Sequence, residues 1–232
     1  MLEIGGLTPL TTIDFPGRLA AVVFCQGCPW RCGYCQNAHL IPPSAEKAVP
    51  WVDVLAFLER RRGLLEGVVF SGGEPTLQSG LPEALRQVRG LGFATGLHTA
   101  GPYPERLAAV LPLLDWVGLD VKAKAAAYPA LTAGGPASGE RAWQSLRRVL
   151  ASGVACEVRT TIHPDLLPEA DLLSLASVLA EAGVTDYALQ ECVTGRCLDP
   201  ALARPSRPAR VSAALSAALA GLFPRFTVRR ES

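Results

Sequence analysis

Three cysteines lie close together in the segment Cys-Pro-Trp-Arg-Cys-Gly-Tyr-Cys, which covers residues 28–35. Cys28, Cys32 and Cys35 are separated by three and then two residues, and the proline and glycine between them are typical of a bent loop. Thiolates at this spacing can reach one metal centre. Because a four-iron cluster normally takes four cysteine ligands, three of them leave one iron open to another group. An open coordination position is typical of a catalytic metal site rather than a structural one.

A structural zinc site is the alternative for the same segment. Cys25 would then be the fourth ligand, since Cys25 with Cys28 and Cys32 with Cys35 form two pairs, each with two residues between. However, Cys25 ends an expected strand, so its side chain can face the core. Only three residues separate the two pairs, fewer than is usual for structural zinc. The spacing therefore favours an iron–sulfur site held by Cys28, Cys32 and Cys35.

A second candidate motif, Gly72-Gly73-Glu74, directly follows an apolar run. Two glycines allow a ligand to approach the backbone closely, and a carboxylate beside them can accept hydrogen bonds from an ammonium group. The alternative is a tight turn between a strand and a helix with a solvated glutamate. The motif is weak alone, but beside a three-cysteine loop it indicates a binding site.

Further polar side chains fall at the ends of the remaining expected strands. Asp120 and Lys122 lie on the same side of one strand end and could form a simple ion pair. Only three lysines occur in the chain, so a lysine at position 122 suggests that a compact ammonium group is needed there. Arg159 lies within a strand and must be paired or face a cavity, because burying an unpaired guanidinium is costly. Thr99 and Gln190 end two other strands and complete the set of candidate binding residues.

Short apolar runs alternate with longer amphipathic stretches along the chain. We expect strands at residues 19–25, 67–71, 93–98, 115–121, 154–162 and 184–190, and helices at residues 51–62, 81–88, 104–111, 139–150, 168–182 and 208–222. This alternation predicts an α/β fold with repeated βα units, a parallel sheet and right-handed crossovers. Six such units form either a partial barrel or an open doubly wound sheet. In both, functional groups gather at the carboxyl ends of the strands, where every candidate above falls.

The composition favours one soluble domain. A chain of 232 residues can form a single core, and its formal charge of +1 gives no reason to expect a nucleic acid or an anionic membrane as partner. No apolar run reaches the roughly 18 residues of a membrane span, and no secretory signal is recognised at the start. Four of the seven cysteines lie between Cys25 and Cys35, which suits metal binding in a reducing compartment. We therefore expect a cytoplasmic protein.

The motifs resemble those of the radical S-adenosylmethionine (SAM) superfamily. The spacing Cys28-x3-Cys32-x-Tyr34-Cys35 is similar to its cysteine signature, and Gly72-Gly73-Glu74 is similar to its GGE motif. More narrowly, the chain resembles the activating proteins of anaerobic ribonucleoside-triphosphate reductase. The stretches that carry this resemblance are residues 12–17 (TIDFPG), 23–29 (VFCQGCP), 69–76 (VFSGGEPT), 118–123 (GLDVKA) and 158–164 (VRTTIHP).

The resemblance implies a fold, cofactors and roles for individual residues. It implies one partial (β/α)6 barrel domain over residues 1–232, with a core at about 18–191 and a C-terminal extension of helix and strand at about 205–230. Cys28, Cys32 and Cys35 would hold a [4Fe-4S] cluster whose open iron binds SAM, Tyr34 would pack near the adenine, and Glu74 would bind the methionine ammonium. The other cofactor-binding candidates are Gly72, Gly73, Thr99, Asp120, Lys122, Arg159 and Gln190.

The resemblance also implies a reaction and its partners. An electron from a flavodoxin or ferredoxin would cleave SAM, and the resulting 5′-deoxyadenosyl radical would take a hydrogen from a glycine of anaerobic ribonucleotide reductase. The alternatives are another glycyl-radical enzyme of the formate-lyase type, a small-molecule substrate, or a non-catalytic zinc-binding interaction domain. Related activators carry an Asp-Thr-Asn-Gly segment that helps to hold a monovalent cation. Since residues 98–101 read His-Thr-Ala-Gly here, we expect Lys122, oriented by Asp120, to supply positive charge near the cofactor carboxylate instead.

Overall fold

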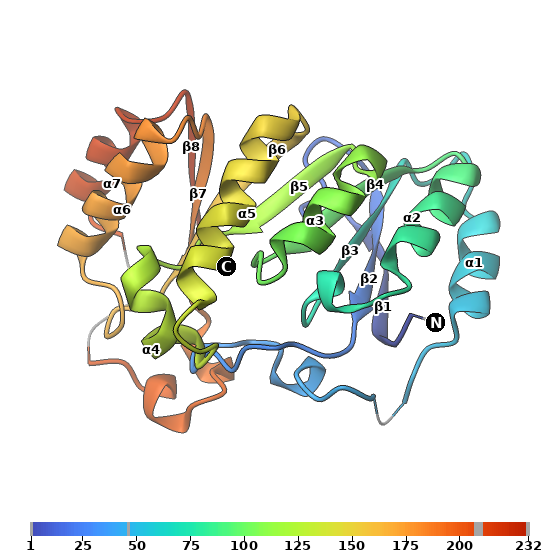
Figure 1. Ribbon diagram of the computed structural model, residues 1–232, viewed down its shortest axis with the longest axis horizontal. Helices are drawn as coiled ribbons and strands as arrows, with labels where there is room; N and C mark the ends of the chain where they lie inside the picture. The colour runs from blue at the N-terminus through green and yellow to red at the C-terminus, as the bar shows by residue number, and fades with distance from the viewer. Residues whose placement is uncertain (1, 46, 207–210, 231–232) are drawn as a thin grey trace.

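The computed structural model describes residues 2–45, 47–206 and 211–230, and it contains one eight-stranded sheet (Figure 1). The order of the strands in the sheet is their order in the chain. They are β1 (Ile4–Thr11), β2 (Ala20–Cys25), β3 (Gly67–Gly72), β4 (Ala94–Thr99), β5 (Trp116–Asp120), β6 (Ala155–Ile162), β7 (Asp186–Glu191) and β8 (Arg225–Arg229). β1 is antiparallel to β2, and every later pair is parallel. β1 and β8 therefore lie at opposite edges of an open, partial barrel.

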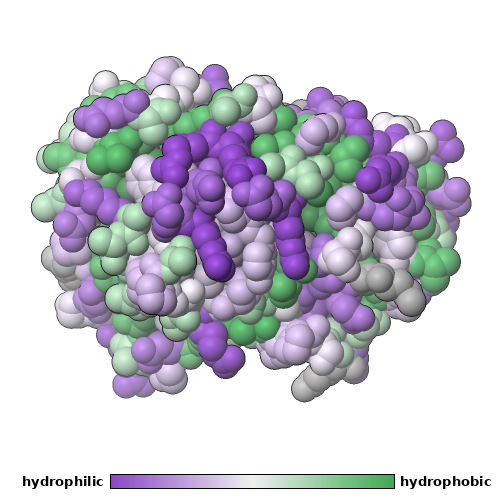
Figure 2. Space-filling view, viewed as in Figure 1, coloured by the Kyte–Doolittle hydropathy of each residue, from purple (hydrophilic) through white to green (hydrophobic). Residues whose placement is uncertain are grey.

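Helices cover the outer face of this sheet (Figure 1). They are α1 (Trp51–Glu59), α2 (Leu81–Gly90), α3 (Pro104–Val110), α4 (Tyr128–Thr132), α5 (Ser138–Ser152), α6 (Glu169–Glu181) and α7 (Ala213–Ala220). Their inward leucines, such as Leu85, Leu107 and Leu146, are fully buried with Phe70 and Leu119 of the strands in the main core. Figure 2 shows polar and apolar side chains interspersed over the helical side. None of the helices in the described part of the chain is long and apolar enough to cross a membrane.

The six strands expected from the sequence are present as β2 to β7, and the α/β fold with a partial barrel is confirmed. The structure adds β1 and α4, which the sequence did not indicate. Gly5, Gly6 and Pro9 interrupt the strand pattern of β1, which pairs with β2 through two shifts of register. The helix expected at residues 208–222 is shorter: the Ser212 side chain accepts a hydrogen bond from Leu215 N at 3.1 Å and caps α7, while residues 208–210 lie outside the described residues.

The connection between β1 and β2 fills the amino-terminal end of the barrel. Phe15 is 3% exposed and stacks on Trp116 with ring centroids 5.7 Å apart. Its ring takes the space that side chains at Gly67 on β3 and Gly96 on β4 would fill. A Cβ on Gly67 would lie 2.8 Å from the ring, and a Cβ on Gly96 would lie 3.4 Å from it. Together with Ala20, Val22 and Val69, these rings form a second, smaller core. A polar cavity lies beyond this core, towards the carboxyl ends of the strands.

Candidate active site

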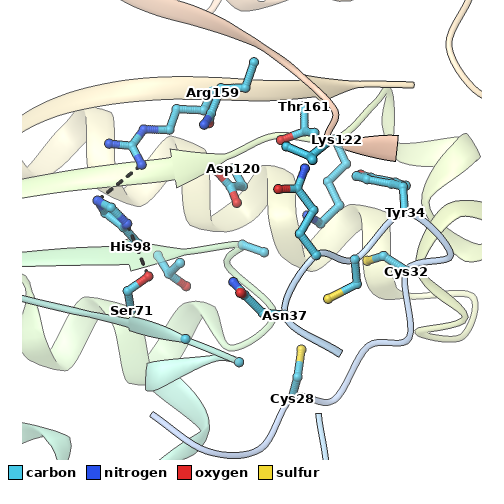
Figure 3. A pocket seen from close by; sticks show the side chains of 18 of the residues that line it. Cys28, Cys32, Tyr34, Asn37, Ser71, His98, Asp120, Lys122, Arg159 and Thr161 are labelled. Carbon is cyan, nitrogen blue, oxygen red and sulfur yellow. Dashed lines mark hydrogen bonds between the residues drawn. The ribbon is translucent and has the colours of Figure 1, made fainter. Parts of the chain in front are cut away.

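Eleven of the twelve binding residues expected from the sequence line one cavity of about 520 Å³ (Figure 3). They are Cys28, Cys32, Tyr34, Cys35, Gly72, Gly73, Thr99, Asp120, Lys122, Arg159 and Gln190. The exception is Glu74. The cavity also has lining residues that the sequence did not single out, among them Trp30, Asn37 and Thr161, and the pair Arg229 and Arg230 at the end of β8. The one sequence signal that could have predicted this strand, and with it the position of the arginines, is the alternation of polar and apolar residues along β8.

The loop that carries the three cysteines is held by backbone hydrogen bonds on several sides. Gly27 N donates to Leu40 O at 2.8 Å, at the start of the loop. Arg31 N donates to Thr132 O of α4 at 2.8 Å, and Asp199 N donates to Gly33 O at 2.8 Å. Because segments far apart in the sequence hold this loop, its conformation depends on the folding of the whole chain.

Gly72 and Gly73 allow the turn after β3 to pack directly on the start of the cysteine loop. Gly72 has φ +114°, and a Cβ there would lie 2.5 Å from Cys25 O. A Cβ on Gly73 would lie 2.3 Å from Gly27 O. We expected these glycines to leave room for a ligand. In the structure both border the cavity, but a Cβ on either would meet backbone atoms. For Gly72 these belong to Phe24 and Cys25 at the end of β2, and for Gly73 to Gly27 and Leu40.

The Glu74 side chain does not line the cavity, so its expected contact with the methionine ammonium stays a prediction. It is 1% exposed, and its carboxylate accepts hydrogen bonds from Thr76 N at 3.0 Å, Thr99 Oγ1 at 2.7 Å and Ala100 N at 3.0 Å, and from the Thr76 hydroxyl. Burial raises the pKa of Glu74, and these hydrogen bonds oppose the rise. The carboxylate therefore joins the turn after β3 to the end of β4.

This placement predicts that Glu74→Ala lowers the free energy of unfolding by about 1.5–3 kcal/mol, because buried donors lose a charged acceptor. Urea unfolding followed by circular dichroism measures the effect. Glu83→Ala is the control, since the Glu83 side chain is 63% exposed and makes surface contacts, an ion pair with Arg86 and a hydrogen bond from Gln87 Nε2 at 3.1 Å. A variant as stable as the unsubstituted chain that binds SAM at least about tenfold more weakly would instead make Glu74 a direct ligand.

Lys122 lies over the ring of Tyr34. Its Nζ is 5.6 Å from the ring centroid, and Tyr34 is 6% exposed. Burial alone would lower the pKa of Lys122, but Tyr34, Cys32 and Asp120 together raise it well above its usual value, so the ammonium stays charged. No ion pair within 4.0 Å joins Lys122 to Asp120 in residues 2–45, 47–206 and 211–230. The alternative of a simple strand-end ion pair is therefore not seen there, and the side chain of Lys122 lies over Tyr34. The expected role of Lys122 near the cofactor carboxylate, with Asp120 orienting it, stays a prediction.

Arg159 occupies the deeper part of the cavity. Its guanidinium turns towards His98 and away from Cys28 and Cys32 (Figure 3). Nε donates to Glu157 Oε1 at 2.7 Å, and Cζ lies 5.0 Å from the ring of Trp116. Nη2 is buried and has no partner among the described residues. Arg159 is thus both paired and directed into a cavity, as its position in a strand requires.

His98 is a neutral, hydrogen-bonded side chain. Its burial and the nearby Arg159 hold its pKa well below the usual value. Nε2 lies 2.9 Å from Asp14 O, so it must carry the proton and donate, and Nδ1 then accepts from Ser71 Oγ at 3.3 Å. In this tautomer Nε2 has no lone pair for Arg159 Nη1, 3.2 Å away.

The donors at the cavity fit a cluster better than a fourfold zinc site. Three thiols of one loop border the cavity, whereas Cys25 is 0% exposed and does not line it. Burial raises the pKa of Cys28 to about 12 and also that of Cys32, so an incoming cation must displace their protons. Among the described residues, no three His, Cys, Asp or Glu side chains are close enough to hold one ion. A four-iron cluster takes one ligand per iron, so its cysteines need not meet at a point.

Comparisons with known proteins agree with this geometry. The sequence profile of the radical SAM superfamily matches residues 22–176. A Methanocaldococcus jannaschii protein provisionally named as a glycyl-radical enzyme activating enzyme is 28% identical over 81% of this chain and 79% of its own. The pyruvate formate-lyase-activating enzyme of Clostridium pasteurianum is 32% identical over 72% of this chain and 71% of its own. Among solved structures, Streptococcus suis SuiB bound to S-adenosylmethionine has a TM-score of 0.55 at 16% identity, covering 72% of this chain and 39% of that one.

The matched region spans β2 to α6, and so includes the cysteine loop and most of the cavity wall. The cysteine spacing and the enclosing cavity meet the needs of the superfamily's cofactors. The chain therefore belongs to the radical SAM superfamily and is an enzyme that uses a [4Fe-4S] cluster and S-adenosylmethionine.

Proposed function

We propose that this enzyme installs a glycyl radical on anaerobic ribonucleoside-triphosphate reductase. Two relatives matched over most of their length carry names of glycyl-radical enzyme activators, which supports this class of reaction. The reductase as target is supported by the sequence stretches at residues 12–17, 23–29, 69–76, 118–123 and 158–164. A formate-lyase-type partner is the second candidate, favoured by the 32% identity to the activator from Clostridium pasteurianum.

Residues of the chain have distinct tasks in this proposal. When bound, the cluster and SAM supply one-electron cleavage of a carbon–sulfur bond. Cys28, Cys32 and Cys35 would hold the cluster, and the charged Lys122 would attract the SAM carboxylate. Other candidates on the cavity wall would contact SAM, namely Gly72, Gly73, Thr99, Asp120 and Gln190. Arg159 would contact it from the deeper part of the cavity. Tyr34 and Trp30, 6% and 4% exposed, close the wall beside the cysteines and exclude water.

The open sheet supports a protein as substrate. Both of its edges contribute to the cavity: Ile13 and Asp14 follow β1, while Arg229 ends β8 and Arg230 directly follows it. Ile13 is 76% exposed, so one edge offers an apolar contact and the other a basic one. An extended segment carrying the acceptor glycine can enter between them. We propose a flavodoxin or ferredoxin as the electron donor.

Electron paramagnetic resonance (EPR) tests the proposal. Cluster-loaded enzyme is mixed anaerobically with SAM, a reduced flavodoxin and either the reductase or a formate-lyase-type enzyme. We expect a glycyl-radical signal with the reductase, formed together with 5′-deoxyadenosine and methionine, and no signal when the acceptor glycine of the reductase is replaced by alanine. A radical on the lyase alone would establish the second candidate. SAM cleavage without a radical on either partner would point to a small-molecule substrate.

A further inference from the structure

Two cysteines outside the cluster motif lie side by side after β7. Cys192 Sγ and Cys197 Sγ are 3.7 Å apart, on either side of a short 3-10 helix, Thr194–Arg196. Cys192 is 6% exposed, whereas Cys197 is only partly buried. A disulfide has an S–S distance of about 2.05 Å, so a small rearrangement of this short segment brings the two sulfurs to bonding distance.

This pair touches the loop that carries the cluster cysteines. Cys192 Sγ lies 4.0 Å from Tyr34 O, and Gln36 Nε2 lies 3.7 Å from Cys192 Sγ. Two residues after Cys197, Asp199 N donates to Gly33 O at 2.8 Å. The residues contacted therefore flank Cys35 on both sides, and a change at the pair reaches the cluster loop directly.

We propose that Cys192 and Cys197 form a reversible disulfide whose state alters the loop that holds the cluster. With a small disulfide such as oxidised glutathione, the Cys197 thiolate attacks one sulfur and releases one glutathione thiol. Cys192 then attacks the mixed disulfide and releases the second thiol. The two cysteines lose two electrons and two protons, and the oxidant gains both. A dithiol reductant reverses the exchange.

The order of attack follows from exposure. Cys197 is the more exposed of the two, while Cys192 lies behind it as the resolving thiol. Burial and the neighbouring Cys192 raise the pKa of Cys197 to about 12, so little thiolate is present at neutral pH and the exchange is slow.

Peptide mapping tests the disulfide. The anaerobic, cluster-loaded full chain is equilibrated with glutathione buffers from reducing to oxidising, its thiols are blocked with N-ethylmaleimide, and it is digested with trypsin. Cleavage after Arg196 separates the two cysteines, so the disulfide appears as two cross-linked peptides that dithiothreitol releases. We expect the cross-link in the unsubstituted chain and in the control Cys156→Ser, whose site lies on β6, and none in Cys192→Ser or Cys197→Ser.

The EPR spectrum of the reduced cluster tests the effect on the loop. We expect the g-values to shift between the oxidised and reduced pair in the unsubstituted chain, and not to respond to glutathione in Cys197→Ser. The absence of a cross-link at every glutathione ratio would overturn the proposal, as would a cross-link that leaves the EPR spectrum unchanged. Neither readout needs a partner enzyme, so the result is independent of the proposed target.

Discussion

Replacing Cys28, Cys32 or Cys35 with alanine is expected to abolish both cluster retention and SAM cleavage. The three thiols border the cavity on one loop, and Gln36 and Asn37, the next polar side chains on that loop, offer no thiolate in their place. Iron and sulfide content and visible absorption after anaerobic reconstitution measure the first effect. Chromatographic detection of 5′-deoxyadenosine measures the second, and we expect it to fall to background.

Cys25→Ser is the matched control, because Cys25 precedes the same loop but is 0% exposed and does not line the cavity. This variant should keep its cluster and cleave SAM. Loss of the cluster in Cys25→Ser, together with retention in any one of the other three variants, would show that the ligand set is wrong.

Arg229→Ala is expected to lower the free energy of unfolding by about 3 kcal/mol. Both carboxylate oxygens of Glu157 accept hydrogen bonds from Arg229, at 2.7 Å each, and Glu157 is only 5% exposed. Without Arg229, this buried carboxylate keeps one partner among the described residues, Arg159 Nε. The expected loss of stability is large because the buried Glu157 carboxylate loses two hydrogen bonds and the positive charge of Arg229.

Urea unfolding of the full chain measures this loss, and Arg225→Ala is the control on the same strand. Arg225 pairs with Asp186 at 3.0 Å, but its side chain is 68% exposed, so its removal should cost no more than about 1 kcal/mol. Equal effects of the two substitutions would mean that the buried pair contributes no more than a surface one.

The core of the fold was predictable because its elements are locally consistent. The apolar runs that became β2 to β7 are bounded by glycine, proline and polar residues, and each is followed by an amphipathic stretch. β1 was missed because its two glycines and its proline hide the strand pattern, and its pairing with β2 shows in no local pattern. α4 is too short for a helical period to show, and it forms where Tyr128 is buried and its hydroxyl accepts from Lys122 N.

The cavity was predictable in outline, since parallel strands bring their carboxyl ends to one edge. The directions of individual side chains were not. Glu74 follows two glycines, and its side chain is oriented by hydrogen bonds from Thr99 at the end of the next strand and from Ala100 directly after it, which no local pattern reveals. Likewise Arg229 enters the cavity only because β8 pairs with β7, an interaction between segments far from the motifs.

The backbone hydrogen bonds that hold the cysteine loop also affect when the enzyme can take up its cluster. The strands lie in the sheet in the order in which they occur in the chain, and the cysteines directly follow the first hairpin, β1 and β2. Part of the hydrogen bonding that holds their backbone comes from segments made later, first from Thr132 and then from Asp199. We therefore expect the loop to reach its final shape only once residue 199 has been made, because a shorter nascent chain would present the thiols without these hydrogen bonds.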